Sequence, residues 1–591
     1  MTSRIIPCNS VYETATFKIL SDGKDITYDY AVLSLSINRE VNRLPSARII
    51  FSDGSAAAET FSASEGNDLI PGKKLEIALG YDGNDKTVFK GIVIKHGLKV
   101  GANGDSLLII ECKDVAVGLT ISRHSRYFKD VKDSDAIATI LKGYAQLSTK
   151  LEATSVKHSE IVQYYTTDWD FILSRADMNG QIVLVKDGTF KAKSPATSGS
   201  PLITLTYGAN ILEIETEMDA RHQYEAVNAK SWNYTNQALL EVTGKEPPVN
   251  KQGNLSGNKL AQVSEVKELG LCHGELVNTQ ELQAWANAQM QKSRLSKIQG
   301  RIKTKGFQDA QPDSLIQLEG MGARFNGLAY VAGVRHELNG GIWRTHLKIG
   351  LRHQWFYKEE DLIERPASGL LPGVSGLQIG VAIQLQDDPS QEDRVLVKMP
   401  IVDHKSANGV WARVATLDAG NKRGSFFRPE IGDEVVLGFI NDDPRHPVIL
   451  GMLNSSQKTA PLIAKDTNHE KGFVTRSGMR VWFDDEKKIM TLETPAGNKV
   501  VISDQDKGIT LCDQTQNTVV LGDGGISLKS PKDIVIEATG KLILKATQDV
   551  SLDGLNVNVK ANAQFKAQGS AGAEVSTSAI AILKGSLVRI N

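Results

Sequence analysis

The sequence predicts a mainly β protein in several domains, and three observations carry that prediction. Strand-like runs separated by turn sequences fill residues 1–364, five further runs of this kind lie within residues 377–456, and an apolar pair returns every eight residues near the end of the chain. A length of 591 residues also exceeds what one hydrophobic core can fill, and it indicates about three or four domains.

Residues 1–364 are expected to be β-rich. Apolar and polar residues alternate at 75–81, 88–100 and 106–115, and the turn sequences DGND and GANGD separate these runs. The region is therefore predicted to consist mostly of short strands.

Helices are expected at three places in the same region. Residues 133–147 have apolar positions at helical spacing, with Asp133 or Ser134 as the N-cap. Residues 167–180 begin at Thr167, a plausible N-cap, and stop at Asn179-Gly180. A longer helix is expected at 279–295.

Two linkers divide the chain. RPASGLLPGVSG (365–376) combines two prolines and three glycines, and the polar LNSSQKTAP (453–461) leads into a second linker assigned to 457–474. Between them, residues 377–456 match a five-stranded oligonucleotide/oligosaccharide-binding (OB) barrel in length and strand number. The five expected strands are 380–386, 393–400, 410–417, 432–440 and 446–453.

Residues 475–591 carry the eight-residue repeat. Alternate side chains of a strand face opposite sides, so each apolar pair points to one face. A single chain of such units would bury one narrow face and leave its strand edges unpaired, whereas three copies wound around a common axis pair every strand and share an interior. The residues expected to fill this needle core are Ile526, Leu528, Ile534, Ile536, Leu542, Leu544, Val550, Leu552, Val557 and Val559. A single-chain β-solenoid or an adhesin stalk remains the alternative.

Composition excludes several other classes of protein. With 68 Lys and Arg against 69 Asp and Glu, the formal charge is −1, and we expect no bulk attraction to nucleic acid. The four cysteines, Cys8, Cys112, Cys272 and Cys512, form no C-x-x-C pair, which argues against a disulfide framework or a zinc ribbon. The N-terminus lacks a signal-peptide pattern, so synthesis and assembly in the cytoplasm are expected.

No catalytic, cofactor or metal site is predicted. Asp168 and Asp170 in the sequence DWD diverge by about 200° on a helix and are better explained as structural residues. The intervals around the needle leave no room for an enzyme domain of the order of 100 residues.

The barrel region also carries a dense set of hallmark residues, which are Trp411, Arg413, Pro429, Gly432, Asp433, Pro444, Pro447 and Gly451. With these residues the sequence resembles the VgrG family of type VI secretion spikes and the related spikes of phage tails and extracellular injection particles. A looser match covers QYYTTDWDFILSRADMNG (163–180) and FKGIVIKHG (89–97).

The resemblance implies a hub of two tube-like barrel domains in residues 1–364, followed by the OB barrel and a triple-stranded β-helix needle. It further implies a non-enzymatic homotrimer that stacks on a hexameric inner tube, contacts baseplate proteins, helps carry effectors and crosses a target membrane when the machine fires. A PAAR-type tip protein would dock on Leu587, Val588, Ile590 and Asn591. A polysaccharide-degrading tail spike is the alternative function, and the type of machine stays open.

Overall fold

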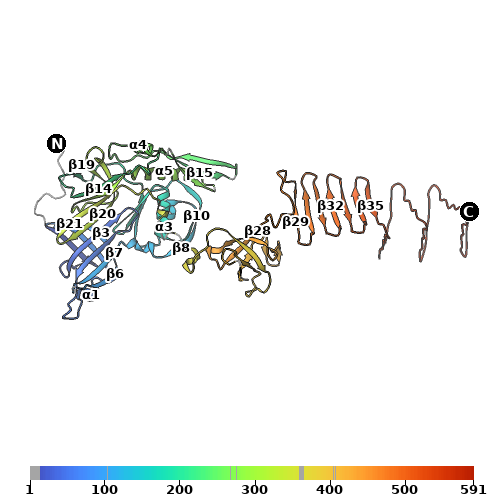
Figure 1. Ribbon diagram of the computed structural model, residues 1–591, viewed down its shortest axis with the longest axis horizontal. Helices are drawn as coiled ribbons and strands as arrows, with labels where there is room; N and C mark the ends of the chain where they lie inside the picture. The colour runs from blue at the N-terminus through green and yellow to red at the C-terminus, as the bar shows by residue number, and fades with distance from the viewer. Residues whose placement is uncertain are drawn as a thin grey trace. The chain divides into compact units, whose positions relative to one another are not determined.

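The computed structural model describes residues 14–590 except 103, 234, 266, 267, 275, 359–361, 363, 364, 404, 406 and 407. Strands dominate it, as the sequence predicts (Figure 1). The chain divides into two compact units, 1–452 and 453–591.

A thirteen-stranded sheet forms the framework of the hub. Its strands are β1 (Ala15–Ser21), β2 (Lys24–Asp25), β3 (Ala31–Glu40), β4 (Ser46–Ser52), β5 (Lys74–Tyr81), β6 (Lys86–Val100), β7 (Ser106–Lys113), β13 (Thr204–Thr206), β14 (Glu213–Met218), β18 (Ile298–Lys305), β19 (Ser314–Glu319), β20 (Gly327–Asn339) and β21 (Ile342–Ile349). The strands expected at 75–81, 88–100 and 106–115 are β5, β6 and β7.

The sheet encloses two separate cores, one around Phe51 and Phe89 and another around Ile302 and Leu318. β20 joins them because it is 13 residues long. Its first part pairs with β19 and its later part with β3, while β21 runs beside it. The two cores of the hub therefore share one continuous sheet, and the division of the hub into two tube-like barrel domains stays a prediction.

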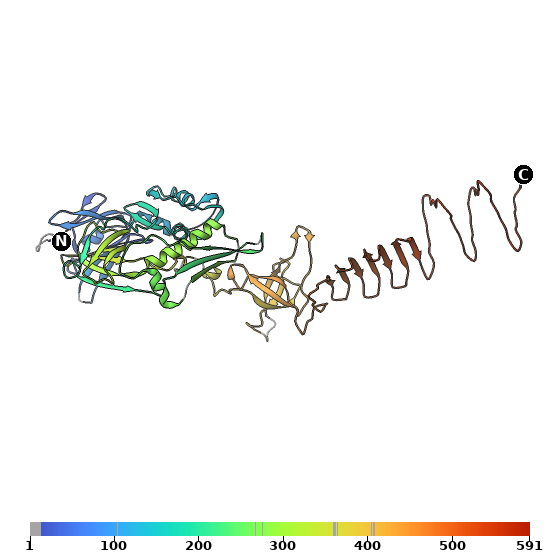
Figure 2. The same ribbon diagram turned by 90° about the horizontal axis from the view of Figure 1, so that it is seen from above.

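Smaller sheets and helices pack around this framework (Figure 2). The additional strands are β8 (Arg123–Lys132) with β10 (Lys157–Thr167), β9 (Ser148–Leu151) with β11 (Ile182–Lys186) and β12 (Thr189–Lys193), and β15 (Ala226–Asn233) with β16 (Ala238–Thr243) and β17 (Glu268–His273). The helices are α1 (Ser62–Glu65), α2 (Asp133–Leu141), α3 (Asp168–Met178), α4 (Gly257–Ala261) and α5 (Thr279–Leu295).

Two of the expected helices have the predicted limits. α5 spans 279–295, and α3 is capped by the Thr167 hydroxyl, which accepts a hydrogen bond from the Asp170 amide. The prediction for α2 was wrong in two respects. The helix ends at Leu141, just before Lys142-Gly143, and its N-cap is Lys132 rather than Asp133 or Ser134. Asp133 instead turns its carboxylate inward to Arg175, where it is fully buried.

The region 378–452 forms a closed barrel in the order β22-β23-β24-β28-β27. These strands are β22 (Gln378–Gln384), β23 (Val395–Lys398), β24 (Val410–Val414), β27 (Glu434–Phe439) and β28 (Pro447–Met452), and a small ribbon of β25 (Ala419–Gly420) and β26 (Arg423–Gly424) projects between them. All five strands predicted for an OB barrel are present, each slightly shorter than or offset from its predicted range.

The second unit begins with a seven-stranded antiparallel meander, seen as a single layer in Figure 1. Its five-residue strands are β29 (Glu470–Val474), β30 (Arg480–Asp484), β31 (Ile489–Glu493), β32 (Lys499–Ser503), β33 (Gly508–Cys512), β34 (Thr518–Gly522) and β35 (Gly525–Lys529). Within this stretch the expectation that each strand pairs with another chain was wrong. Turns of a few residues bring each strand back beside the preceding one of the same chain.

Candidate assembly surface

The meander β29–β35 has one apolar face. The register places successive apolar residues directly opposite one another on neighbouring strands, for example Leu492 opposite Val500 and Val500 opposite Leu511. Two parallel columns result, because residues two positions apart on a strand share a face. One column is Phe473, Val481, Leu492, Val500, Leu511, Val519 and Leu528, and the other is Phe483, Met490, Ile502, Ile509, Leu521 and Ile526.

The opposite face is mostly polar. Arg480 lies opposite Glu493, and the Arg480 Nε donates to Glu493 Oε2 at 2.8 Å. Further along the same face, Thr510 and Ser527 flank Val520. A single-layer sheet with one apolar and one polar face is stable only when the apolar face is covered.

Nothing in the described part of this chain covers the two columns. Leu492 is 44% exposed, Leu528 55% and Ile526 75%. A groove of 760 Å³ runs beside the first column and is lined by Leu492, Val500, Leu511, Val519 and Leu528. Contiguous exposed apolar surface of this kind marks an interaction site.

The predicted needle-core residues fall into two groups. Ile526 and Leu528 lie on β35, side by side on the apolar face. The others follow β35, where no strand is assigned within the described chain, and every one of them is more than half exposed. These are Ile534, Ile536, Leu542, Leu544, Val550, Leu552, Val557 and Val559. Their role in trimer formation remains a prediction.

The predicted tip-docking residues are also exposed. Leu587 is 70%, Val588 51% and Ile590 86% exposed, whereas Asn591 lies outside the described residues. No contact in the described chain tests their role.

The hallmark residues of the barrel build turns and outer strand surface rather than a ligand site. Gly432 adopts φ +88°, which favours glycine, and the Asp433 carboxylate accepts from the Glu430 amide in the same turn. Pro429 and Pro447 are buried. Trp411 is half-buried and Arg413 is exposed, because both face outward while the intervening Ala412 is fully buried.

The β27–β28 connection contains Pro444, a further hallmark residue, and an ion pair between Asp443 and Arg445. The Asp443 carboxylate, 5% exposed, accepts from the Arg445 amide and from its guanidinium. The hydrogen bond from Arg445 lowers the pKa of Asp443 to about 2. Pro444 lies within this ion-paired turn, and Gly451 lies on β28 opposite Val436. The geometry accounts for these residues as parts of the barrel frame.

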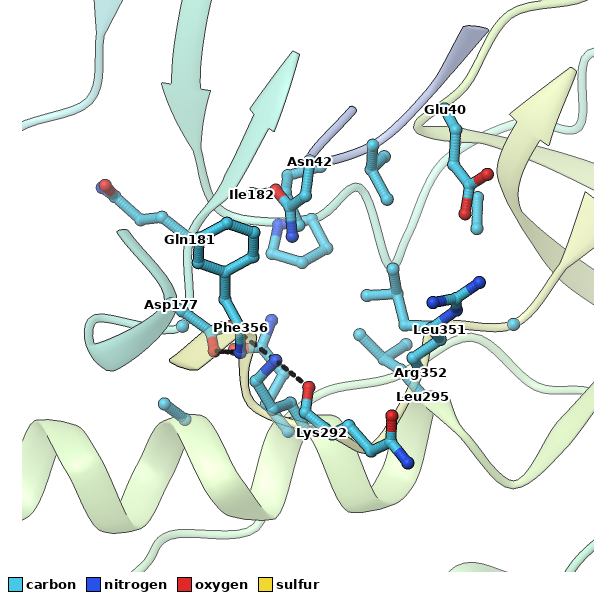
Figure 3. Close-up of a pocket in the computed structure, with 18 of the residues that line it drawn as sticks. Glu40, Asn42, Asp177, Gln181, Ile182, Lys292, Leu295, Leu351, Arg352 and Phe356 are labelled. Carbon is cyan, nitrogen blue, oxygen red and sulfur yellow. Dashed lines mark hydrogen bonds and ion pairs between the residues drawn. The ribbon is translucent and has the colours of Figure 1, made fainter. Parts of the chain in front are cut away.

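The hub contains a pocket of 80 Å³ that is lined by charged, polar and apolar side chains (Figure 3). Among its charged groups, Asp177 is paired with Lys292 and Glu40 with Lys348. Figure 3 shows Asp177 and Lys292 close to Phe356, whose amide donates to Asp177 Oδ2 at 3.0 Å. The Asp177–Lys292 pair and the Phe356 amide join α3, α5 and the segment after β21, whereas the Glu40–Lys348 pair joins β3 and β21. This arrangement is that of a structural junction.

The two aspartates of DWD do not converge. Asp168 is fully buried and accepts hydrogen bonds from Arg126 and Tyr144, whereas Asp170 accepts from the Thr167 hydroxyl. Burial alone would raise the pKa of Asp168, but the hydrogen bonds from Arg126, Gln163 and Tyr144 hold it below its ordinary value. The described residues contain no cluster of three or more His, Cys, Asp or Glu arranged to hold a metal ion. They also contain no helix that is long and apolar enough to span a membrane.

Comparison with known families covers both parts of the first unit. The Alg8 N-terminal domain family matches residues 11–340, more than half of the chain, and the type VI secretion system/phage-baseplate injector OB domain matches residues 378–453.

The individual relatives include VgrG spike proteins of type VI secretion systems. The type VI secretion system spike protein VgrG1b of Pseudomonas aeruginosa is 23% identical over 440 residues, which are 69% of this chain and 57% of that protein. VgrG3 of Vibrio cholerae is 35% identical over 101 residues, 16% of this chain and 10% of that protein. The chain thus spans little more than half the length of VgrG1b.

An E. coli component of the type VI secretion system, c3393, has a TM-score of 0.37 at 13% identity, with 74% of this chain and all of that chain covered. The Francisella PdpA–VgrG complex has a TM-score of 0.39 at 10% identity, with 88% and 80% covered. The family match over residues 11–340 shows that the chain belongs to the Alg8 N-terminal domain family, and in sequence it is similar to VgrG spike proteins.

Proposed function

We propose that this chain forms a homotrimeric puncturing spike at the tip of a contractile injection machine. The uncovered apolar face of β29–β35 carries the proposal. Fully burying a Val, Leu, Ile or Phe side chain stabilises a protein by roughly 1.5–3 kcal/mol, and each column holds several of them. Covering both columns therefore supplies a large driving force for association with further copies of the chain.

A trimer can cover the apolar columns and also give the repeats after Lys529 strand partners, whereas a dimer can only cover the columns. Two meanders packed face to face would cover the columns but would leave the repeats after Lys529 without strand partners. Three chains wound around one axis give those repeats hydrogen-bonding neighbours and a shared interior for Leu544 and its equivalents. A shaft whose strands are paired between chains resists compression because many hydrogen bonds must break together.

The remaining parts of the proposal concern partners. The hub of each trimer stacks on a hexameric inner tube and contacts baseplate proteins, and a PAAR-type tip protein sits on Leu587, Val588, Ile590 and Asn591. The spike is made and assembled in the cytoplasm, acts without catalysis and carries effectors across a target membrane on firing. The similarity to VgrG1b and the match to the injector OB domain support this proposal. The proposal does not specify which type of contractile machine the spike belongs to.

The mass of the purified chain in solution tests the trimer. Sedimentation equilibrium should give three times 64.3 kDa. Leu528→Asp places a charge on the apolar face and should abolish the trimer, because an unpaired buried carboxylate costs several kcal/mol. Ser527→Asp is the matched control, since Ser527 is its neighbour on β35, is also exposed in one chain and points to the polar face. A monomeric or dimeric wild-type protein, or equal behaviour of the two variants, would contradict the proposal.

A further inference from the structure

A serine and a histidine of the hub form a hydrogen bond that the proposed spike function leaves unused. Ser64 belongs to α1 and His96 to β6, two elements that lie side by side in the hub (Figure 1). The Ser64 Oγ is 2.8 Å from His96 Nε2. Both residues are partly exposed, so a small molecule in solution can reach them.

The other ring nitrogen of His96 fixes the direction of this hydrogen bond. His96 Nδ1 lies 3.0 Å from the backbone carbonyl oxygen of Leu69, which can only accept a hydrogen bond. Nδ1 therefore carries the proton of the neutral ring, and Nε2 has the lone pair that accepts from the Ser64 hydroxyl. A nucleophile, a base and a group that orients the base are thus connected in series, which is the arrangement that activates a serine for covalent chemistry.

Buried neighbours hold these groups in place. The Asp53 carboxylate, 5% exposed, accepts from the backbone amides of Ala63 and Ser64, at 3.0 and 2.8 Å. Leu69, which supplies the orienting carbonyl, is fully buried. The serine and the base are therefore already positioned in the free protein, and such positioning removes part of the entropic cost of a reaction with a bound molecule.

The chain contains an internal comparison for this pair. Among the described residues, Thr345 and His336 form the other hydrogen bond between a hydroxyl and an imidazole, at 3.1 Å. Both side chains are fully buried, and His336 Nε2 has no hydrogen-bond partner in the described chain. That pair is closed to solvent and its base is not oriented by a third group, so it lacks two features that Ser64 and His96 have.

Exposed apolar side chains neighbour the pair in the chain. Leu98 is two residues beyond His96 on β6, so both point to the same face of the strand, and Leu98 is 49% exposed. Ile70, which follows Leu69, is 40% exposed. These side chains offer apolar contact to a molecule with a short hydrocarbon chain.

We propose that Ser64 is an acylation site, at which the hydroxyl takes up a short-chain acyl group from an activated ester. The Ser64 oxygen attacks the carbonyl carbon of the ester, and its proton moves to His96 Nε2. The bond from the carbonyl carbon to the leaving oxygen then breaks, and His96 gives the proton to that oxygen. The modification is stoichiometric, belongs to one chain and does not depend on the proposed trimer or on the spike function.

Peptide mass spectrometry of the folded full chain after exposure to p-nitrophenyl acetate tests the site. Ser64 should carry one acetyl group. Hydroxylamine, which cleaves esters and leaves amides intact, distinguishes this product from acetylated lysines. In urea the unfolded chain should acylate Ser64 no faster than Ser62, because the hydrogen-bonded arrangement exists only in the fold.

Variants assign the reaction to its residues. His96→Gln removes the base and should slow the acylation of Ser64 about a hundredfold or more, which is within the usual contribution of a general base. Ser64→Ala should remove the hydroxylamine-sensitive acetyl group from this peptide. Ser62→Ala is the matched control, since Ser62 is an exposed serine of the same helix, and it should react as the wild type does.

Circular dichroism verifies that the variants fold. If His96→Gln does not fold, the ratio of Ser64 to Ser62 acylation in the folded wild type becomes the decisive measurement. A ratio of about one, no acetyl group on Ser64 of the folded wild type, or an undiminished rate in folded His96→Gln would overturn the proposal.

Discussion

His336 is fully buried in the hub sheet on β20, where its protonation state is fixed by its surroundings. Its Nδ1 lies 3.1 Å from Thr345 Oγ1, and its Nε2 has no partner among the described residues. Burial, then the nearby charges of Arg39 and His346, lower the pKa of His336 from 6.5 to about 3. Only the neutral imidazole therefore fits the folded hub over most of the pH range.

The hub should lose stability as the pH falls. The folded-state pKa of His336 is depressed, so protons bind more readily to the unfolded chain, and the contribution is complete above the ordinary value of 6.5 and is lost below it. Between pH 8 and pH 5 this one group should lower the free energy of unfolding by about 2 kcal/mol. The unfolding midpoint of His336→Gln should depend less on pH than that of the wild type, measured by tryptophan fluorescence. His273→Gln, at an exposed histidine, should retain the wild-type slope.

Residues whose role depends on distant partners could not be assigned from the sequence. Asp133 was expected to cap a helix, and its position at the start of α2 made that reasonable. In the fold it binds Arg175, His158 and Asn179, which are 25 to 46 residues away in the chain. Thr167, by contrast, was identified correctly, because a cap is made within three residues of its own position.

At the scale of elements, the OB barrel shows that a hallmark residue of the sequence need not belong to the hydrophobic core. Trp411 lies opposite Leu396 on the outer side of β24, while Ala412 faces Val395 inside. Successive side chains of β24 point to opposite faces, so Trp411 faces outward because Ala412 faces the core. The five strands themselves were predictable, because their apolar alternation is local.

Replacing an apolar residue of the barrel core should therefore destabilise the barrel more than replacing Trp411. Leu437 is fully buried in the barrel core, so Leu437→Ala should lower the free energy of unfolding of the barrel by about 3 kcal/mol. Trp411→Ala should cost only about 1 kcal/mol, because its ring is half-buried. Limited proteolysis followed by mass spectrometry gives the rate of barrel opening for each variant. Faster opening in Trp411→Ala than in Leu437→Ala would mean that the ring is part of the core.

The meander β29–β35 illustrates a second limit of sequence reasoning. The apolar pair Ile526 and Leu528 was expected to share a face, and it does, as do the pairs at 509 and 511 and at 519 and 521. The partner of each strand was not predictable, since the same alternation suits pairing within a chain or between chains. Short turns favour pairing within one chain for residues 470–529. The repeats after Lys529, by contrast, have no strand partner within the described chain.

At the scale of the whole molecule, assembly from several chains should control how the protein unfolds. If three chains are intertwined after Lys529, they must separate before any one of them can unfold completely. Unfolding is then governed by a high barrier, and stability behaves as a rate. The apparent melting midpoint of the full chain should rise with scan rate and should be independent of protein concentration. A reversible midpoint that follows concentration would indicate a rapidly exchanging assembly instead.

The eight-residue repeats allow the decisive comparison between adjacent positions. Leu544 and Ile543 are 69% and 75% exposed in one chain, so neither should matter greatly to a monomer. In a threefold assembly Leu544 faces the shared interior, and Leu544→Asp brings three carboxylates together without water. Removing even one unpaired ion from water costs several kcal/mol, and the three charges also repel one another. Size-exclusion chromatography should show no trimer at pH 7 and partial recovery near pH 4, where the carboxyl groups become neutral. Ile543→Asp, which faces outward, should leave the trimer intact, and equal trimer yields for the two variants would show that the repeats do not enclose a common axis.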